Sequence, residues 1–239
     1  LGAFPVVAHS AVSSGSIECE NFHFAYTRRY DALHIDSLTL PQGSIIAVIG
    51  HNGAGKSTFA RCLCGLEKHC KGVVNINRNQ YNRKQRLSLC YMVMQDVNHQ
   101  LFTESTEEEM LLSMKEPNTS QAERILQRLD LFQFKDRHPM ALSGGQRVAK
   151  ATALISDREI LVFDEPTSGL DLQHMQEVAN ELTAIQDMGK TSLVITHDYE
   201  LIVSCCTYVL HLENGKIQEQ YVLDEKGIQR LKTFFMKTR

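Results

Sequence analysis

Short apolar runs alternate along the chain with longer stretches in which apolar and polar residues follow a helical period. Three runs, SIIAVI, EILVFDE and TSLVITHD, are almost continuously apolar up to a glycine or a polar residue. Such runs are typical of strands that are buried on both faces of a parallel sheet. The stretches KSTFARCLCGL and LQHMQEVANELTAIQ predict helices between them. This alternation of strands and helices predicts an α/β fold with a mostly parallel sheet.

Further strands are expected on both sides of this core. The segments SIECENFHFAY and ALHIDSLTL indicate extended structure, and the PQG that follows the second segment indicates a turn. VVNIN and LCYMVM predict two short strands on either side of a charged stretch at 83–86. Near the end of the chain, YVLHLENGKIQEQ is typical of a hairpin around Asn214 and Gly215. The tail at 224–239 predicts an amphipathic helix.

Between the two halves of this pattern lies a stretch with no strand signal. TESTEEEMLLSM and TSQAERILQRLD predict two helices that are separated at Pro117. Thr106 and Glu109 have the spacing of a capping box, and the acidic run Glu107–Glu109 favours a helix N-terminus. A further helix is expected through QRVAKATALI. The chain therefore predicts a helical lobe, at about residues 96–150, set into the α/β body.

The glycine-rich segment GHNGAGKST follows the apolar run SIIAVI directly. It matches the phosphate-binding pattern G-x-x-x-x-G-K-[ST] between a predicted strand and a predicted helix. Glycines let backbone amides point inward at an anion, and the helix N-terminus adds unpaired donors. Lys56 can reach the β- and γ-phosphates of a nucleotide, and Ser57 can hold Mg²⁺. The residues expected to bind nucleotide here are Asn52, Gly53, Ala54, Gly55, Lys56, Ser57 and Thr58. The alternative is a flexible turn that contains a lysine.

Two acids end the apolar run EILVFDE. Asp164 closes the predicted strand, so it can help to hold Mg²⁺ beside the glycine-rich loop. Glu165 follows and can reach the water that attacks a γ-phosphate, as general base. The alternative is a solvated strand end, which is weakened because a phosphate-binding loop needs a metal-holding acid on a neighbouring strand. The sequence thus predicts ATP and Mg²⁺ as cofactors.

Composition limits the classes of function. Of the 239 residues, 43% are hydrophobic and 22% are charged, and the formal net charge is -3. This is a globular balance, and a mildly acidic chain is unsuited to general nucleic-acid binding, which needs a basic field. No apolar run approaches the ~20 residues that cross a bilayer, so contact with a membrane is expected only through a partner.

Seven cysteines, an odd number, lie mostly in apolar runs. They are interpreted as reduced intracellular thiols that pack as small hydrophobes. A metal site at Cys62, Cys64 and Cys70 is the alternative, although their spacing does not match zinc pairs. The chain begins at Leu1 and continues into AVSSGS, which is typical of a linker. We expect residues 1–15 to be a linker or extension and the chain to be an excised piece or part of a longer fused protein.

The segments ALSGGQ and FDEPTSGLD complete a set of motifs that resembles ABC-type ATPases. The glycine-rich loop, Gln95, LSGGQ, ILVFDE, SGLD and His197 stand in that family's order, and the resemblance covers residues 16–215. It implies a P-loop NTPase core with a mostly parallel sheet, an antiparallel β subdomain and an inserted helical lobe. It places the ATP-binding domain at 16–223 and a C-terminal helix at 224–239.

In this family two ATP-binding domains close head to tail, and each ATP lies between the P-loop of one and the signature loop of the other. The resemblance implies that Gln95 senses Mg²⁺ and the attacking water, and that His197 contacts the γ-phosphate and orients Glu165. It also implies that Tyr26 stacks on adenine, the alternative being a half-buried strand tyrosine. The expected catalytic residues are Glu165, His197, Gln95 and Lys56, and the expected metal ligands are Ser57, Gln95 and Asp164. The nucleotide contacts expected from the signature loop and the dimer seam are Ser143, Gly144, Gly145, Gln146 and Asp171.

Two departures from the family pattern accompany the signature motif. Gln146 runs directly into the arginine of QRVA, where the family usually has additional residues, and Lys150 and Thr152 replace an apolar residue and an arginine that are usual there. The segment QDVNHQLFTESTEEEM is similar to ATPase subunits of energy-coupling factor importers, which take up vitamins or transition-metal ions. Asp96 and the QLF at 100–102 carry this finer similarity.

Three functions follow from these patterns. The first is an ATPase subunit at the cytoplasmic face of a membrane, which drives transport through transmembrane partners and a second ATP-binding domain, in a homo- or heterodimer. The second is a soluble ABC-type ATPase that acts on ribosomes or another macromolecule; such proteins usually join two cores by a long charged linker, which this sequence lacks. The third is a nucleotide-gated module without turnover, against which Lys56, Glu165 and His197 argue. The first is favoured.

Overall fold

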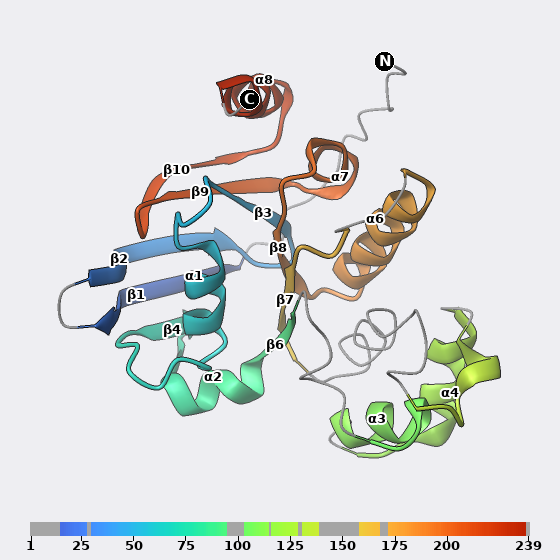
Figure 1. Cartoon of the computed structure of the whole chain (residues 1–239). Helices are drawn as coiled ribbons and strands as arrows, with labels where there is room; N and C mark the ends of the chain where they lie inside the picture. The colour runs from blue at the N-terminus through green and yellow to red at the C-terminus, as the bar shows by residue number, and fades with distance from the viewer. Residues whose placement is uncertain are drawn as a thin grey trace.

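The strands in the described part of the chain form two sheets, shown with the surrounding helices in Figure 1. The computed structural model describes residues 15–27, 30–94, 103–114, 116–128, 131–138, 158–167 and 172–237. Its elements in chain order are β1 (Ser16–Thr27), β2 (Tyr30–Pro41), β3 (Ile45–Ile49), α1 (Lys56–Leu63), β4 (Val73–Ile76), β5 (Asn79–Tyr81), α2 (Arg83–Leu89), β6 (Cys90–Val93), α3 (Thr106–Ser113), α4 (Thr119–Arg128), the 3-10 helix η2 (Phe132–Phe134), β7 (Ile160–Asp164), α6 (Leu172–Asp187), β8 (Thr191–Ile195), α7 (Tyr199–Cys205), β9 (Tyr208–Glu213), β10 (Lys216–Val222) and α8 (Glu225–Lys237).

The larger sheet has the strand order β10-β9-β3-β8-β7-β6. Its pairs from β9 to β6 are parallel, and only the edge strand β10 is antiparallel, to β9. The three continuously apolar runs become the adjacent strands β3, β8 and β7 at its centre. The prediction of a mostly parallel sheet is confirmed, and so is the hairpin at Asn214 and Gly215, which both have the positive φ angles, 50° and 72°, of a tight turn.

Both faces of this sheet are buried, which explains why its central strands are apolar without alternation. In β3, Ile45, Ala47 and Ile49 pack into a core with α6, α7 and α8, whereas Ile46 and Val48 pack into a second core with α1 and the smaller sheet. Each fully buried Ile stabilises the fold by about 1.5–3 kcal/mol. The carboxyl ends of β3, β7 and β8 therefore lie side by side at a fixed edge.

The smaller sheet is antiparallel, with the strand order β2-β1-β4-β5. It realises the predicted antiparallel β subdomain. The pairing of β1 with β2 is interrupted by register shifts between Phe24 and Thr27, a stretch of β1 that includes Tyr26. A bulge of this kind re-aims a side chain.

The two predicted helices on either side of Pro117 are α3 and α4, which lie to one side of the large sheet in Figure 1. The predicted capping box at Thr106 is wrong. The N-cap is Ser105, whose hydroxyl accepts a hydrogen bond from the Glu108 amide at 3.1 Å. The Thr106 hydroxyl instead donates to the Arg137 carbonyl at 3.0 Å, so a contact distant in sequence decides where the helix begins.

Four elements of the described chain, β5, α2, η2 and α7, were not among the predicted ones. In α2 the guanidinium of Arg86 is fully buried, donates to the Gly72 carbonyl at 2.7 Å and lies over the ring of Phe22 at 4.7 Å. The stretch at 83–86, which the sequence shows only as charged, therefore supports the core.

All seven cysteines are buried and unpaired, as the interpretation of packed thiols predicts. Burial raises the pKa of the Cys19 thiol to about 12. Within the described residues, none of the helices has the length and apolar character that crossing a membrane demands. Residues 1–14 of the predicted linker at 1–15 and the predicted helix through QRVAKATALI lie outside the described residues.

Candidate nucleotide-binding site

The glycine-rich loop joins the buried strand β3 to helix α1. Gly50 has φ 150°, and a Cβ atom there would lie 2.1 Å from the Leu212 carbonyl oxygen, so only glycine fits against the neighbouring strand β9. Gly55 precedes the helix in the left-handed region at φ 99° and offers no side-chain cap. The first amides of α1 are thus left without a side-chain partner, which makes the helix N-terminus an anion-binding end.

Lys56 begins α1 and is 7% exposed. Its Nζ donates to the carbonyl oxygens of Gly50 at 2.7 Å and His51 at 3.0 Å, so the ammonium lies inside the curl of the loop. Burial lowers the pKa of Lys56, while the carboxylates of Glu165, Glu213 and Asp164 oppose that shift. The loop therefore holds the partly desolvated ammonium group of Lys56, whose hydrogen bonds go to backbone carbonyl oxygens.

Asp164 is the last residue of β7, and its carboxylate hydrogen-bonds the hydroxyl of Ser57 at the start of α1. Burial raises the pKa of Asp164, and the Ser57 hydrogen bond and the charge of Lys56 act in the opposite direction. The pair offers a hydroxyl and a carboxylate oxygen, the hard ligands that Mg²⁺ prefers. Ser57 and Asp164 are two of the three predicted metal ligands. They come together although Ser57 lies in α1, after β3, and Asp164 ends β7, which is distant in the chain.

Glu165 follows directly and adopts a left-handed backbone conformation, with φ 50°. Its amide donates to the Ile195 carbonyl at 2.9 Å, which ties the end of β7 to the end of β8. Burial, together with the nearby charges of Asp164 and Asp198, raises the pKa of Glu165 to about 7. A carboxyl group with this pKa exchanges a proton readily near neutral pH, which suits a general base.

His197 lies just beyond β8, and its Nε2 is 3.2 Å from Glu165 Oε1. Burial and the charge of Lys56 lower the pKa of His197, so at neutral pH the contact is a hydrogen bond from a neutral imidazole rather than a full ion pair. Asp198, which was not among the predicted site residues, accepts a hydrogen bond from Thr167 and raises the pKa of Glu165. Its position next to His197 at a strand end is the signal that was available.

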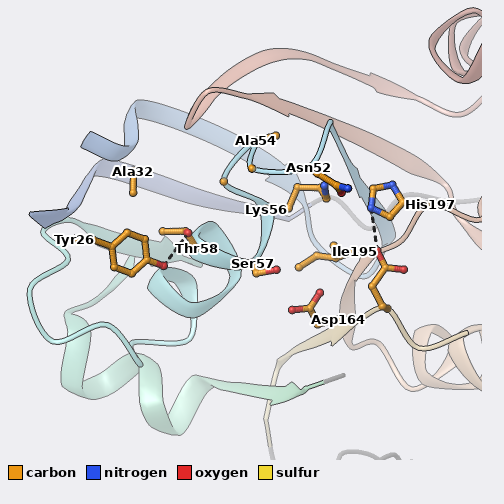
Figure 2. Close-up of a pocket in the computed structure, with 13 residues that line it drawn as sticks. Tyr26, Ala32, Asn52, Ala54, Lys56, Ser57, Thr58, Asp164, Ile195 and His197 are labelled. Carbon is orange, nitrogen blue, oxygen red and sulfur yellow. Dashed lines mark hydrogen bonds and ion pairs between the residues drawn. The ribbon is translucent and has the colours of Figure 1, made fainter. Parts of the chain in front are cut away.

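Lys56, Ser57, Asp164, Glu165 and His197 line one pocket of about 430 Å³, shown in Figure 2. Glu165 and His197 lie at one end of it, Lys56 and Ser57 in the middle, and Tyr26 with Thr58 at the other. The Tyr26 hydroxyl is 3.1 Å from Thr58 Oγ1, and the side chain of Tyr26 is 59% exposed. An exposed aromatic face at the far end of a phosphate cradle is suited to stacking on a base.

The pocket thus unites most of the predicted site. All seven residues predicted from the loop line it, together with Tyr26, Asp164, Glu165 and His197. Six further predicted site residues lie outside the described residues: Gln95, Ser143, Gly144, Gly145, Gln146 and Asp171. Glu213 was not predicted. Its carboxylate accepts a hydrogen bond from the His51 amide at 3.0 Å because β9 lies next to β3.

A model of the ABC transporter family matches residues 33–168. A putative ABC transporter ATP-binding protein of Treponema denticola is 45% identical over 193 residues, which are 80% of this chain and 40% of that protein. A second one, of Clostridium tetani, is 33% identical over 84% of this chain and 48% of its own length. The chain thus spans less than half the length of these curated relatives.

Solved structures share the fold. An ATP-binding cassette of an ABC transporter in its ADP conformation has a TM-score of 0.78 at 22% identity, over 92% of this chain and 96% of that one. CbiO1 of Clostridium perfringens, described as part of the ABC transporter complex cbiONQ, has a TM-score of 0.74 at 28% identity, over 91% of this chain and 94% of its own.

Proposed function

Because this chain belongs to the ABC transporter family of ATP-binding domains, a family of ATPases, we propose that it binds and hydrolyses ATP to drive transport through membrane-embedded partners. The observation that carries the proposal is the pairing of Glu165 with His197, 3.2 Å apart, in the same pocket as the loop that holds Lys56. A module that only senses nucleotide has no need of a carboxyl group whose pKa is about 7 beside a neutral imidazole.

Binding of ATP uses the loop and the helix end. The free amides of the first turn of α1 donate to the phosphates, and Lys56 exchanges its carbonyl partners for phosphate oxygens. Ser57 and Asp164 would hold Mg²⁺, which neutralises charge on the β- and γ-phosphates when it is bound. Tyr26 stacks on the adenine at the opposite end of the pocket.

Hydrolysis depends on Glu165. In its ionised form Glu165 accepts a proton from the attacking water at a carboxylate oxygen, and His197 fixes the orientation of that carboxylate through its Nε2. Because the carboxyl group has a pKa of about 7, it accepts and releases this proton within the normal pH range. Gln95, as predicted from the sequence, would contact Mg²⁺ and the attacking water.

The partners are a second ATP-binding domain and transmembrane subunits. A signature loop at 143–146 on the facing domain would complete the enclosure of the γ-phosphate. The curated relatives are more than twice as long as the region they share with this chain, which supports a facing domain either in the same polypeptide or in another subunit. In this arrangement the chain lies at the cytoplasmic face of the membrane, held by its partners.

The finer proposal is a role in energy-coupling factor import of a vitamin or metal ion. It is supported by the QLF segment after Asp96 and by the similarity to CbiO1. The alternative, a soluble ATPase acting on ribosomes or another macromolecule, is less favoured because the relatives carry names of transporter ATP-binding proteins.

The test is to capture the full-length protein from detergent-solubilised membranes and identify what accompanies it. We expect ATP-dependent phosphate release together with integral membrane proteins, including a small substrate-binding one if the importer type is right. A Glu165→Gln variant should retain the same partners without phosphate release. Recovery of the protein alone, or with ribosomal RNA in amounts that match it, would contradict the transport proposal.

A further inference from the structure

Two histidines and an aspartate gather on the outward face of the small antiparallel sheet, outside the nucleotide pocket. His23 of β1 lies directly opposite His34 of β2 in the strand register, and Asp36 follows two residues later on the same face of β2. The flanking residues Phe22 and Ile35 point the other way, into the core. The hydrophobic packing beneath them thus fixes the backbone that carries all three polar side chains.

The distances from Asp36 to the two histidines match a metal site better than they match hydrogen bonds. Asp36 Oδ1 is 3.4 Å from His23 Nε2 and 3.5 Å from His34 Nε2. Both distances exceed the roughly 2.7–3.2 Å of a good hydrogen bond to nitrogen. They agree with the edge of about 3.4 Å between two ligands of a tetrahedral ion whose bonds are about 2.1 Å long. One ligand atom from each residue lies within 4.8 Å of the other two.

A hydrogen bond also joins the two imidazoles. Their Nδ1 atoms are 3.1 Å apart, with the rings nearly perpendicular at 86°. One ring must accept the hydrogen bond that the other donates, so the accepting Nδ1 carries no proton. An ion that binds both Nε2 atoms therefore breaks this hydrogen bond and moves the proton of the accepting ring from Nε2 to Nδ1. The side chains of His34 and Asp36 are 45% and 76% exposed, which leaves them free to close on an ion by small rotations and leaves the fourth position to water.

We propose that His23, His34 and Asp36 form a binding site for a divalent transition-metal ion of the zinc type. Two imidazoles and one carboxylate are the ligand set that such borderline ions take with an open position. A bound ion joins β1 to β2 a short way before Tyr26. His34 also donates its amide to the Gly215 carbonyl at 2.8 Å, and Gly215 donates to Ala54 at 2.9 Å. The ion therefore cross-links the β1–β2 strand pair, which borders the nucleotide pocket.

The test is a titration of the full-length, tag-free protein with Zn²⁺ and with Co²⁺ after metal removal and without nucleotide. Three variants remove one ligand each: His23→Ala, His34→Ala and the isosteric Asp36→Asn. The matched control is His69→Ala, which removes an exposed histidine from a loop outside the cluster. Far-UV circular dichroism and the melting temperature without metal establish that each variant is folded.

We expect the wild type and the His69→Ala control to bind one equivalent of ion. Each ligand variant should bind this ion at least about tenfold more weakly, since loss of even an outer-sphere partner of a metal ligand lowers metal affinity about 10- to 100-fold. The bound ion should raise the melting temperature of the wild type and leave that of the three variants unchanged. The Co²⁺ spectrum should show no sulfur-to-metal charge-transfer band for this equivalent. The proposal would be overturned if the three variants bound the ion as tightly as the wild type. It would also be overturned if the Co²⁺ that the variants fail to bind showed a sulfur-to-metal charge-transfer band in the wild type.

Discussion

Replacing Glu165 by glutamine should stabilise the nucleotide-free protein while it abolishes turnover. The folded protein raises the pKa of the Glu165 carboxyl from 4.5 to about 7, chiefly by burying it, and the side chain is only 20% exposed. Between these two pH values the folded state binds a proton that the unfolded state has lost. The cost of the ionised carboxylate is therefore absent well below pH 4.5 and complete above about pH 7, where it is up to about 3 kcal/mol.

A glutamine has nearly the same shape and no charge at any pH, so Glu165→Gln removes this cost. At about pH 8 we expect the free energy of unfolding to rise by up to about 3 kcal/mol, which corresponds to roughly 6–12 °C in melting temperature for a chain of this size. At about pH 5.5 the gain should fall by more than half, because the wild-type carboxyl is then largely protonated in the folded state. Urea unfolding at both pH values measures it.

The control is Glu159→Gln, which removes the same charge from an exposed position just before β7. This variant should change stability little at either pH. In the full-length protein, Glu165→Gln should bind ATP as well as the wild type and lose phosphate release by about 10²–10⁴-fold. A variant that is no more stable at pH 8, or whose gain is the same at both pH values, would refute the electrostatic reasoning. Near-normal phosphate release would refute the assignment of Glu165 as base.

The other predictions concern the two ends of the pocket and the C-terminal helix. Lys56→Ala should weaken ATP binding by about 10- to 100-fold in equilibrium dialysis, since it removes the charged donor inside the loop. Tyr26→Ala should weaken it by roughly tenfold, whereas Tyr26→Phe should bind ATP nearly as well as the wild type, because stacking needs only the ring. Phe234→Ala should lower the free energy of unfolding, measured in urea, by about 1–2 kcal/mol, because the half-buried ring packs on His51 at 5.6 Å between centroids. The control Met236→Ala, at a position that is 80% exposed, should have no effect.

The sequence predicted those elements whose signal is local. The continuous apolar runs of β3, β7 and β8 could be recognised because burial on both faces leaves no polar position in a strand. Helix α2 was not predicted, although Asn82 and Gln85 form its capping box. Its residues were noted only as a charged stretch between two strands, and the burial of Arg86 depends on the Gly72 carbonyl, which lies on the other side of β4 and β5 in the sequence.

The start of α3 shows a different limit. Ser105 with Glu108 and Thr106 with Glu109 have the same capping-box spacing, so the sequence offers two equivalent starts. The structure selects Ser105 because the Thr106 hydroxyl is already used by the Arg137 carbonyl, 31 residues further along the chain. No local pattern can distinguish two caps when the deciding partner is this distant.

The same distinction applies to the pocket. That Lys56, Asp164 and His197 meet follows from motif order and from the rule that parallel strands end at one edge, and the structure brings all three to one pocket. The pKa of Glu165 does not follow from any motif. It depends on how far the end of β7 is buried, on the charge of the preceding residue Asp164 and on the charge of Asp198 beyond β8. A glutamate in the same motif but at a more open strand end would keep an ordinary pKa and would be a weaker base at neutral pH. The motifs of the site are therefore encoded locally, whereas the strength of its proposed base is a property of the assembled sheet edge.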